Sequence, residues 1–239
     1  KILITSSVPE EGKSLVAANL AVALQELGRR VILIGADMRR PSLFRVFQLP
    51  LEPGLSNYLQ GKASLDEVMH VLPEAHGLTI VSGGSTARRP TDLLSSEKWD
   101  EMLSTLSKSF QYILVDTPPL LAVTDARILC RLVDKVIVVA RANRTTQDML
   151  LGVQDQLSHA PLKFVASVLN NVHIGRRGGY GDEYGYGYGY GYYGQKAKGR
   201  SPKRKPQPKK IPTRDPGDLA QPEGGDAPPG VPGTPAQDD

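Results

Sequence analysis

Residues 7–14 combine a glycine, a lysine and a serine at a spacing that suits phosphate chemistry. They read Ser-Val-Pro-Glu-Glu-Gly-Lys-Ser and match the phosphate-binding loop pattern, except that Ser7 stands in place of its first glycine. Gly12 lets the backbone approach a polyphosphate. Lys13 brings a positive charge to the β- and γ-phosphates, and the hydroxyl of Ser14 is a ligand for Mg²⁺. We therefore predict ATP and Mg²⁺ as cofactors. The predicted nucleotide-binding residues are Pro9, Glu10, Glu11, Gly12, Lys13, Ser14 and Leu15.

A strand–turn–helix connection with an incidental lysine and serine is the competing explanation for this motif. The flanking sequence favours the phosphate loop, because 1–6 is an apolar strand pattern and 13–27 is an Ala- and Leu-rich helix pattern that stops at Gly28. A loop that enters a helix N-terminus aims backbone N–H groups and the helix dipole at one point, where an anion is stabilised.

Two further apolar segments end in aspartates that could serve the same site. Asp37 follows the strand pattern 31–35, and Asp116 ends the strand pattern 112–116. Carboxylates at strand ends beside a phosphate loop are the usual metal-side groups of such nucleotide-binding proteins, and the metal stabilises their charged form. We predict Lys13, Asp37 and Asp116 as catalytic residues, and Ser14, Asp37 and Asp116 as metal-side residues. A turn or helix-capping role is the alternative for both aspartates.

Arg39 and Arg40 come directly after Asp37, and two interpretations of them stay open. They are candidates for stabilising a transferred phosphate or binding a partner, and equally for ordinary solvated surface charge.

Strand and helix patterns alternate along the chain, and the elements that they predict would position the residues named above. This alternation predicts an α/β fold of the P-loop NTPase type, a mostly parallel sheet with helices on both faces, because several strands are apolar on both sides. Ligands of such sheets bind at the carboxyl ends of the strands, where the motifs fall. The predicted strands are 1–6, 31–35, 78–82, 112–116, 135–140 and 164–170. The predicted helices are 13–27, 64–72, 91–107, 125–132 and 145–158, and Ser64 with Glu67 forms a capping box.

Composition sets limits on the setting of the protein. The charge is nearly balanced, with 29 basic and 25 acidic residues, so the isoelectric point near 9.1 says little about the whole molecule. The single cysteine, Cys130, lies in an apolar stretch and is interpreted as a small core residue in a reducing compartment. No apolar run is long enough to span a membrane. The chain begins at Lys1 rather than Met, which suggests a fragment of a longer polypeptide and leaves an upstream membrane anchor open.

The composition changes sharply near Gly175, which divides the chain into a predicted ATP-binding domain, 1–175, and a tail. The segment 176–194 is rich in glycine and tyrosine, and 195–239 is basic and then rich in Pro, Gly and Asp. Because the tail has almost no aliphatic residues to bury, we expect it to be disordered. The basic part, 196–214, is either a solvated linker, which we favour, or a site for anionic lipid or nucleic acid. No nucleic-acid partner is expected, because no such fold accompanies it.

Taken together, these motifs resemble the bacterial tyrosine kinases that control capsule and exopolysaccharide synthesis. The resemblance rests on four segments, which read Pro-Glu-Glu-Gly-Lys-Ser at 9–14, Gly-Ala-Asp-Met-Arg-Arg-Pro at 35–41, Asp-Thr-Pro-Pro at 116–119, and the tyrosine cluster at 180–193. It implies transfer of the ATP γ-phosphate to tyrosines of the protein's own tail, between neighbouring subunits. It also places Asn170, at the last strand end, on the adenine side of the nucleotide. The implied phosphoacceptors are Tyr180, Tyr184, Tyr186, Tyr188, Tyr190, Tyr192 and Tyr193.

The resemblance further implies a setting for the protein. The expected partners are a transmembrane activator or a fused membrane domain, further copies of the chain, and the polysaccharide synthesis and export machinery. The expected location is the cytoplasm, at the inner face of the cell membrane through a partner or an upstream segment. The family's oligomerising helix lies upstream of the first strand and is absent from this sequence.

One departure from the family pattern bears on activity. Gly35 stands where the family has the first acidic residue of its second motif, a carboxylate that is thought to help activate the tyrosine hydroxyl. A tyrosine hydroxyl has an unperturbed pKa of about 10 and benefits from a base. An ATP-binding pseudokinase that acts as a scaffold of the same machinery is therefore the alternative function. A positional ATPase is a third and less favoured hypothesis. Such proteins carry a second lysine in the phosphate loop, at the position that Val8 occupies in this chain.

Overall fold

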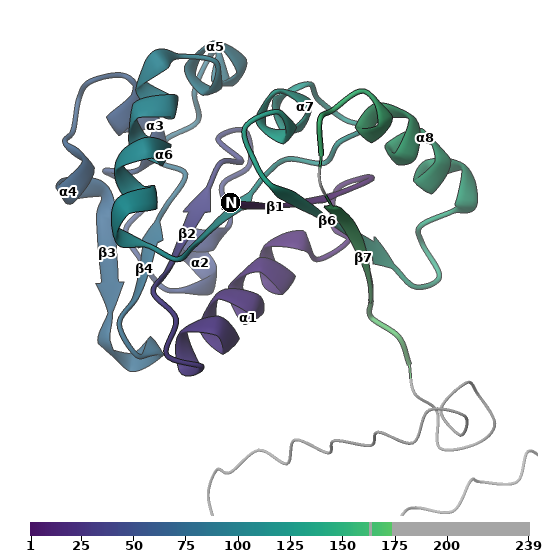
Figure 1. Cartoon of the computed structure of the whole chain (residues 1–239), viewed down its shortest axis with the longest axis horizontal. Coiled ribbons are helices and arrows are strands. Elements are labelled where there is room, and N and C mark those ends of the chain that lie inside the picture. Colours follow the sequence, from purple (N-terminus) through teal and green to yellow (C-terminus); the bar gives the residue numbers. More distant parts are fainter. Residues whose placement is uncertain (163, 174–239) are drawn as a thin grey trace, which may run out of the picture. The chain divides into compact units, whose positions relative to one another are not determined.

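Seven strands form one sheet in the order β3-β4-β2-β5-β1-β6-β7 (Figure 1). The structure is a computed structural model, and it describes residues 1–162 and 164–173. All neighbouring strands are parallel except β3, which runs antiparallel to β4 at one edge. The strands are β1 (Ile2–Ser6), β2 (Val31–Gly35), β3 (Met69–Leu72), β4 (Leu78–Val81), β5 (Tyr112–Asp116), β6 (Lys135–Arg141) and β7 (Phe164–Asn170).

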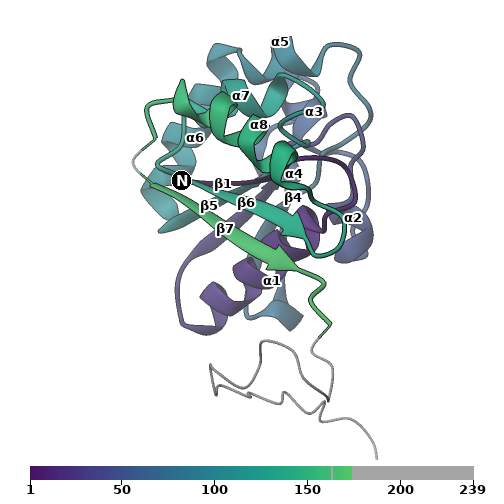
Figure 2. The same ribbon diagram turned by 90° about the vertical axis from the view of Figure 1, so that its right-hand side faces the viewer.

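Helices cover both faces of this sheet. When the molecule is turned, α1 lies on one side of the sheet, and α7 and α8 lie on the other (Figure 2). The helices are α1 (Lys13–Glu26), α2 (Leu43–Val46), α3 (Leu55–Leu59), α4 (Leu65–Val68), α5 (Pro90–Leu94), α6 (Glu97–Ser109), α7 (Asp125–Cys130) and α8 (Gln147–Ser158), with a 3₁₀ turn at Pro73–Ala75. The predicted fold class, a mostly parallel sheet with helices on both faces, is confirmed.

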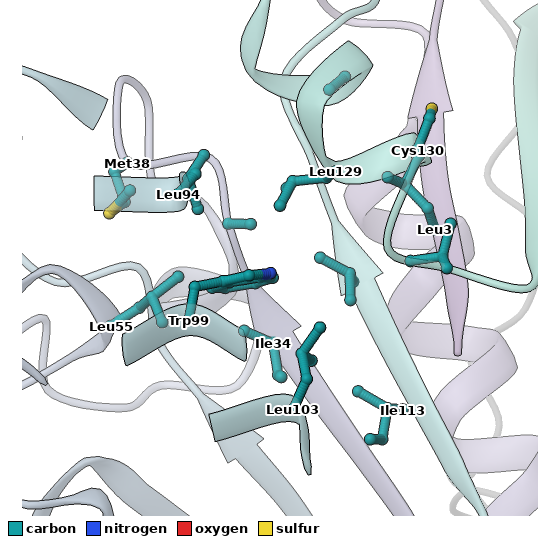
Figure 3. Close-up of a cluster of buried hydrophobic side chains, with 14 of the residues drawn as sticks. Leu3, Ile34, Met38, Leu55, Leu94, Trp99, Leu103, Ile113, Leu129 and Cys130 are labelled. Carbon is teal, nitrogen blue, oxygen red and sulfur yellow. The ribbon is translucent and has the colours of Figure 1, made fainter. Parts of the chain in front are cut away.

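Each face of the sheet has its own apolar core, as strands apolar on both sides require. On the α1 face, small residues of α1 such as Ala17 and Ala21 pack on Ile4 and Leu33. The opposite core is larger and centres on the buried Trp99 of α6 (Figure 3). Cys130 belongs to this second core, and its burial confirms the interpretation of that residue as part of the interior.

Two predicted helices are wrong in extent. The segment 64–72 begins with the predicted capping box of Ser64 and Glu67, but only Leu65–Val68 is helical. The next four residues, Met69–Leu72, form β3 instead, because they gain backbone hydrogen bonds along the open edge of β4. The segment 91–107 is divided into α5 and α6 by Ser95 and Ser96, whose hydroxyls donate to carbonyls of the preceding turn.

Short helices α2 and α3 were not predicted, because four or five residues are too few to show a helical period. The tail segments 176–194 and 195–239, with all the predicted phosphoacceptor tyrosines, lie outside the described residues. Among the residues that the structure describes, no helix is both long and apolar enough to cross a membrane.

Candidate functional site

The phosphate loop connects the end of β1 to the start of α1. Gly12 is the N-cap of α1 and has a φ of 92°, in the left-handed region that glycine tolerates. A Cβ atom at Gly12 would lie 2.1 Å from Nδ2 of Asn170, so this position has no room for a side chain. The same Nδ2 donates a hydrogen bond to the carbonyl of Glu11 at 3.0 Å. Asn170 at the end of β7 therefore stabilises the phosphate loop through this hydrogen bond.

Lys13 lies between the two predicted aspartates at the head of α1. Its Nζ is 3.4 Å from Oδ2 of Asp37 and 3.6 Å from Oδ1 of Asp116. It also donates to the hydroxyl of Ser14 at 3.2 Å. Both carboxylates are buried, so the interaction with the ammonium is little screened by water. The three residues that sequence spacing selected separately thus meet at one point.

Asp116 is the group at this site that fits a bound cation. Its Oδ1 is buried and accepts no hydrogen bond in the described structure. Burial, the largest influence, raises the pKa of Asp116 above its ordinary 3.8, although Lys13 and Ser14 act in the opposite direction. A magnesium ion would offset that burial by adding positive charge to an oxygen that has the Lys13 ammonium 3.6 Å away but accepts no hydrogen bond.

Ser14 and Asp37 would complete the protein's share of a Mg²⁺ site. Within residues 1–162 and 164–173, no group of three or more His, Cys, Asp or Glu side chains forms a closed metal site. An open arrangement of a hydroxyl and two carboxylates suits Mg²⁺, which keeps several waters and relies on the phosphates for further ligands. The residues present therefore fit the predicted ion.

A cavity of about 620 Å³ opens in front of the loop. One side consists of the phosphate loop and the start of α1, and the other consists of the segments that follow β2 and β5. Its lining combines apolar side chains with the charged side chains of Glu10, Lys13, Asp37, Arg39 and Arg40. The apolar part is formed by Leu15, Val46, Pro118, Pro119, Ala122 and Val123.

The segment after β2 is held in place by an ion pair between the partly exposed Arg39 and the buried carboxylate of Asp125. Arg39 donates from Nε to Oδ2 of Asp125 at 2.8 Å and from Nη2 to Oδ1 at 3.0 Å, and Thr91 adds a third bond at 2.7 Å. Burial by itself raises the pKa of Asp125, but the bonds from Arg39 and Thr91 outweigh it, and the net pKa is lowered. Arg39 is thus engaged in the fold although it also lines the cavity, as does Arg40, whose backbone N–H donates to Asp37.

Gly35 lies in the strand next to Asp116, and the two residues are paired in register. A Cβ atom at position 35 would meet the Gly83 nitrogen at 3.2 Å and Cδ1 of Leu43 at 3.3 Å. A larger residue is tight there, but only by a few tenths of an ångström. Returning the carboxylate of the family pattern to this position therefore requires a small shift of the Gly83 backbone and the Leu43 side chain.

The predicted nucleotide-binding residues divide into two groups in the structure. Pro9, Glu10, Gly12, Lys13, Ser14 and Leu15 line the cavity. Glu11 turns its carboxylate into the protein, and Asn170 uses its amide to hold the loop. A contact of Asn170 with adenine stays a prediction.

Sequence reasoning missed two groups of residues near the site. Ser42 donates to the hydroxyl of Ser14 at 2.8 Å, next to the predicted metal position. The segment 141–145, at the end of β6, contacts the phosphate loop. A pair of threonines before α8 was the only local sign of the latter, and it indicates only a helix cap.

Comparisons with known proteins agree with this geometry. The sequence profile of a family described as an AAA domain matches residues 10–159. The chain is 32% identical over 180 residues to the tyrosine-protein kinase YwqD of Bacillus subtilis, covering 75% of this chain and 76% of that protein. It is 37% identical over 171 residues to the tyrosine-protein kinase ptk of Acinetobacter johnsonii, covering 72% of this chain but 23% of that protein.

Among solved structures, the chain is similar to the kinase domain of the Escherichia coli tyrosine kinase ETK. The TM-score is 0.70 and the identity 30%, with 78% of this chain and 72% of that one covered. The chain thus spans less than a quarter of the Acinetobacter kinase and about three quarters of the Bacillus kinase. The chain carries the phosphate loop and the strand-end aspartates, and it is 32% identical to the Bacillus kinase over three quarters of both chains. It therefore belongs to the bacterial tyrosine kinase family of P-loop proteins.

Proposed function

We propose that this domain is a protein-tyrosine kinase that uses ATP and Mg²⁺. The observation that carries the proposal is the position of Lys13, which lies between two buried carboxylates at the start of a helix and faces an open cavity. The helix N-terminus and the lysine together favour the terminal phosphates of a nucleotide. Magnesium, held by Ser14, Asp37 and Asp116, would neutralise charge on the phosphate oxygens.

In the reaction, the tyrosine oxygen forms a bond to the γ-phosphorus while the bond from that phosphorus to the β–γ bridging oxygen breaks. ADP leaves, and the phenolic proton passes to a carboxylate or to water. Lys13 offsets the charge that develops on the transferred group, and the loop amides hold the departing diphosphate. Phosphoryl transfer depends mainly on such positioning and charge stabilisation, so it demands little covalent chemistry from the protein.

The apolar side of the cavity suits a tyrosine acceptor. Leu15, Val46 and Pro119 offer a surface for an aromatic ring next to the charged groups at Lys13. The acceptors that we propose are the seven tail tyrosines from Tyr180 to Tyr193, presented by another copy of the chain. Each phosphate adds about −1.5 to −2 charge, so multiple phosphorylation would alter self-association.

A phosphotyrosine assay tests this proposal directly. The protein is incubated with ATP and Mg²⁺, with and without a membrane activator, and its phosphotyrosines are mapped by mass spectrometry. We expect label on the tail tyrosines, none in Lys13→Met, and none in a variant whose seven tail tyrosines are phenylalanine. The phenylalanine variant should still bind ATP, which separates loss of the acceptor from loss of the nucleotide. Absence of phosphotyrosine under every condition would refute the kinase proposal.

A pseudokinase scaffold is the second candidate, and Gly35 is the observation that favours it. The discriminating variant is Gly35→Asp, which restores a carboxylate beside Asp116. Gly35→Ala is the matched control, since it adds the same Cβ contacts to Gly83 and Leu43 without the charge. Activity that appears with aspartate and not with alanine would identify the natural protein as the scaffold form.

The setting that we propose follows the family resemblance. The domain would act in the cytoplasm at the inner membrane face, with a transmembrane activator or a fused membrane domain, in polysaccharide synthesis and export. Association with membranes of cells that produce the full-length protein, measured by fractionation, checks this placement.

A further inference from the structure

The carboxylate of Glu11 is buried in the phosphate loop without a cationic partner. The residue is fully buried, and no ion pair among the described residues includes it. Its oxygens accept from the hydroxyl of Ser7 at 2.8 and 2.9 Å and from the N–H of Val8 at 2.9 Å. Ser7, the residue that replaces the first glycine of the loop pattern, therefore bonds to the carboxylate four residues later.

A third donor to this carboxylate comes from a distant part of the chain. The hydroxyl of Thr145 donates to Oε1 of Glu11. The same hydroxyl oxygen accepts from the N–H of Arg141 at 2.7 Å, which leaves its hydrogen for the carboxylate. Thr145 directly precedes Thr146, the N-cap of α8, whose hydroxyl accepts from the N–H of Met149.

The rest of the segment 141–145 contacts the neighbouring residue of the loop. Arg141 donates to the carbonyl of Glu10 at 3.0 Å, and Arg144 donates to its carboxylate at 3.0 Å. Glu10 has a φ of 66°, a left-handed conformation that is strained for a residue other than glycine. These bonds therefore fix a backbone conformation that Glu10 would not favour alone.

Burying a carboxylate beside a phosphate site is costly unless hydrogen bonds compensate it, as those from Ser7, Val8 and Thr145 do here. Removing its charge from water is unfavourable, and the charge repels an approaching polyphosphate. The cavity is lined by Glu10 and Gly12 but not by Glu11, so this carboxylate does not face the nucleotide position. What it does contact is the backbone and side chains that set the shape of the loop.

We propose that Glu11 and Thr145 are positioning residues that preorganise the phosphate loop and couple it to the start of α8. This proposal deepens the proposed function, because it rests on the loop binding ATP. With the loop already shaped, its N–H groups need not be ordered when the nucleotide arrives, and less affinity is lost to ordering. The coupling also means that nucleotide binding changes the stability of the 141–145 segment.

The experiment compares Thr145→Val, which keeps the shape and removes the hydroxyl, with Thr145→Ser, which keeps the hydroxyl. Two quantities are measured in the full chain. The first is hydrogen exchange at the Val8 amide without nucleotide, because that N–H donates to Glu11. The second is the Kd for a fluorescent ATP analogue with Mg²⁺, measured well below the unfolding temperature. Glu11→Gln is a second variant with the same two measurements.

We expect Thr145→Val to speed exchange at Val8 and to weaken nucleotide binding, each by about fivefold or more, while Thr145→Ser stays near the parent protein. Glu11→Gln should resemble Thr145→Val. The proposal is overturned if Thr145→Val changes neither quantity, if it changes exchange but not affinity, or if valine and serine are equally impaired. A drop in the free energy of unfolding with both quantities unchanged would also overturn it, since the role would then be structural only.

The two proposals fail in different ways. If the parent protein has no affinity for ATP and Mg²⁺, the proposed function is refuted together with the claim that preorganisation aids nucleotide binding. Exchange at Val8 still decides, without nucleotide, whether Thr145 orders the loop.

Discussion

The contact between Gly12 and Asn170 leads to a quantitative prediction about Gly12→Ala. An alanine at position 12 would need a φ of 92°, which costs about 1–2 kcal/mol for a residue with a Cβ atom. Its Cβ would also stand 2.1 Å from Nδ2 of Asn170, so that amide must move away. The move breaks the hydrogen bond to the carbonyl of Glu11, which contributes about 1 kcal/mol. The expected total loss of unfolding free energy is about 2–3 kcal/mol.

A double-mutant cycle separates these two costs. Asn170→Ala alone should cost about 1 kcal/mol, because it removes the same hydrogen bond. In that background the amide is gone, so Gly12→Ala should cost only the backbone part, about 1–2 kcal/mol. The expected coupling between the two sites is therefore about 1 kcal/mol, with the double variant more stable than the sum of the single effects predicts.

Urea unfolding followed by the fluorescence of Trp99 measures all four proteins. Trp99 is the single tryptophan of the chain and is buried in the core, so its emission reports global unfolding. Equal m-values across the set are required for the free energies to be compared. If Gly12→Ala costs the same in both backgrounds to within about 0.5 kcal/mol, the contact with Asn170 does not limit this position, and our reasoning is refuted.

Three further predictions concern buried titratable groups. Asp116→Asn should raise the unfolding free energy without nucleotide, because burial raises the pKa of Asp116 and its charged form therefore costs stability above pH 3.8. Lys13 keeps Asp37 as a second carboxylate partner. The same variant should bind ATP less tightly in Mg²⁺. Asp125→Asn should cost about 1.5 kcal/mol at pH 7, because the partly exposed Arg39 loses charge-assisted hydrogen bonds to a buried carboxylate. This contribution should fade below pH 3.8, since the lowered pKa of Asp125 gives stability that is lost as pH falls through the folded value. Cys130 should resist thiol reagents at pH 8 until the protein unfolds, because burial raises the pKa of its thiol to about 11.

Each of these three predictions can be contradicted by a specific measurement. Urea titrations at several pH values measure the two aspartate variants. A less stable Asp116→Asn protein would show that the carboxylate holds the fold together. A loss for Asp125→Asn that is the same at pH 3 and pH 7 would show that its charge is irrelevant. Labelling of folded protein with a thiol reagent, read by mass, would contradict the burial of Cys130.

Local spacing was enough to predict the parts of the site that are close in the chain. Gly12, Lys13 and Ser14 are consecutive, and their types already limit them to the start of a helix that follows a strand. Asp37 and Asp116 were predictable because the carboxyl ends of parallel strands meet at one edge of a sheet. The family resemblance added the tyrosine kinase assignment, which the comparisons support.

Other features depended on partners that no local pattern reveals. Met69–Leu72 has the residues to continue a helix, yet it forms a strand because the edge of β4 offers hydrogen bonds. Arg39 could equally have faced solvent, and its engagement follows from Asp125, which lies 86 residues later in the sequence. In both cases local propensity is weak compared with a tertiary contact.

The sequence by itself determined that a phosphate loop, two acidic strand ends and an α/β sheet are present, because each is written in residues a few positions apart. Only the tertiary structure decided how the loop is held. The carboxylate of Glu11 meets the hydroxyl of Thr145 across 134 residues, and Gly12 meets Asn170 from the last strand. Such contacts arise when the sheet brings β1, β6 and β7 side by side, and strand order is a property of the whole fold.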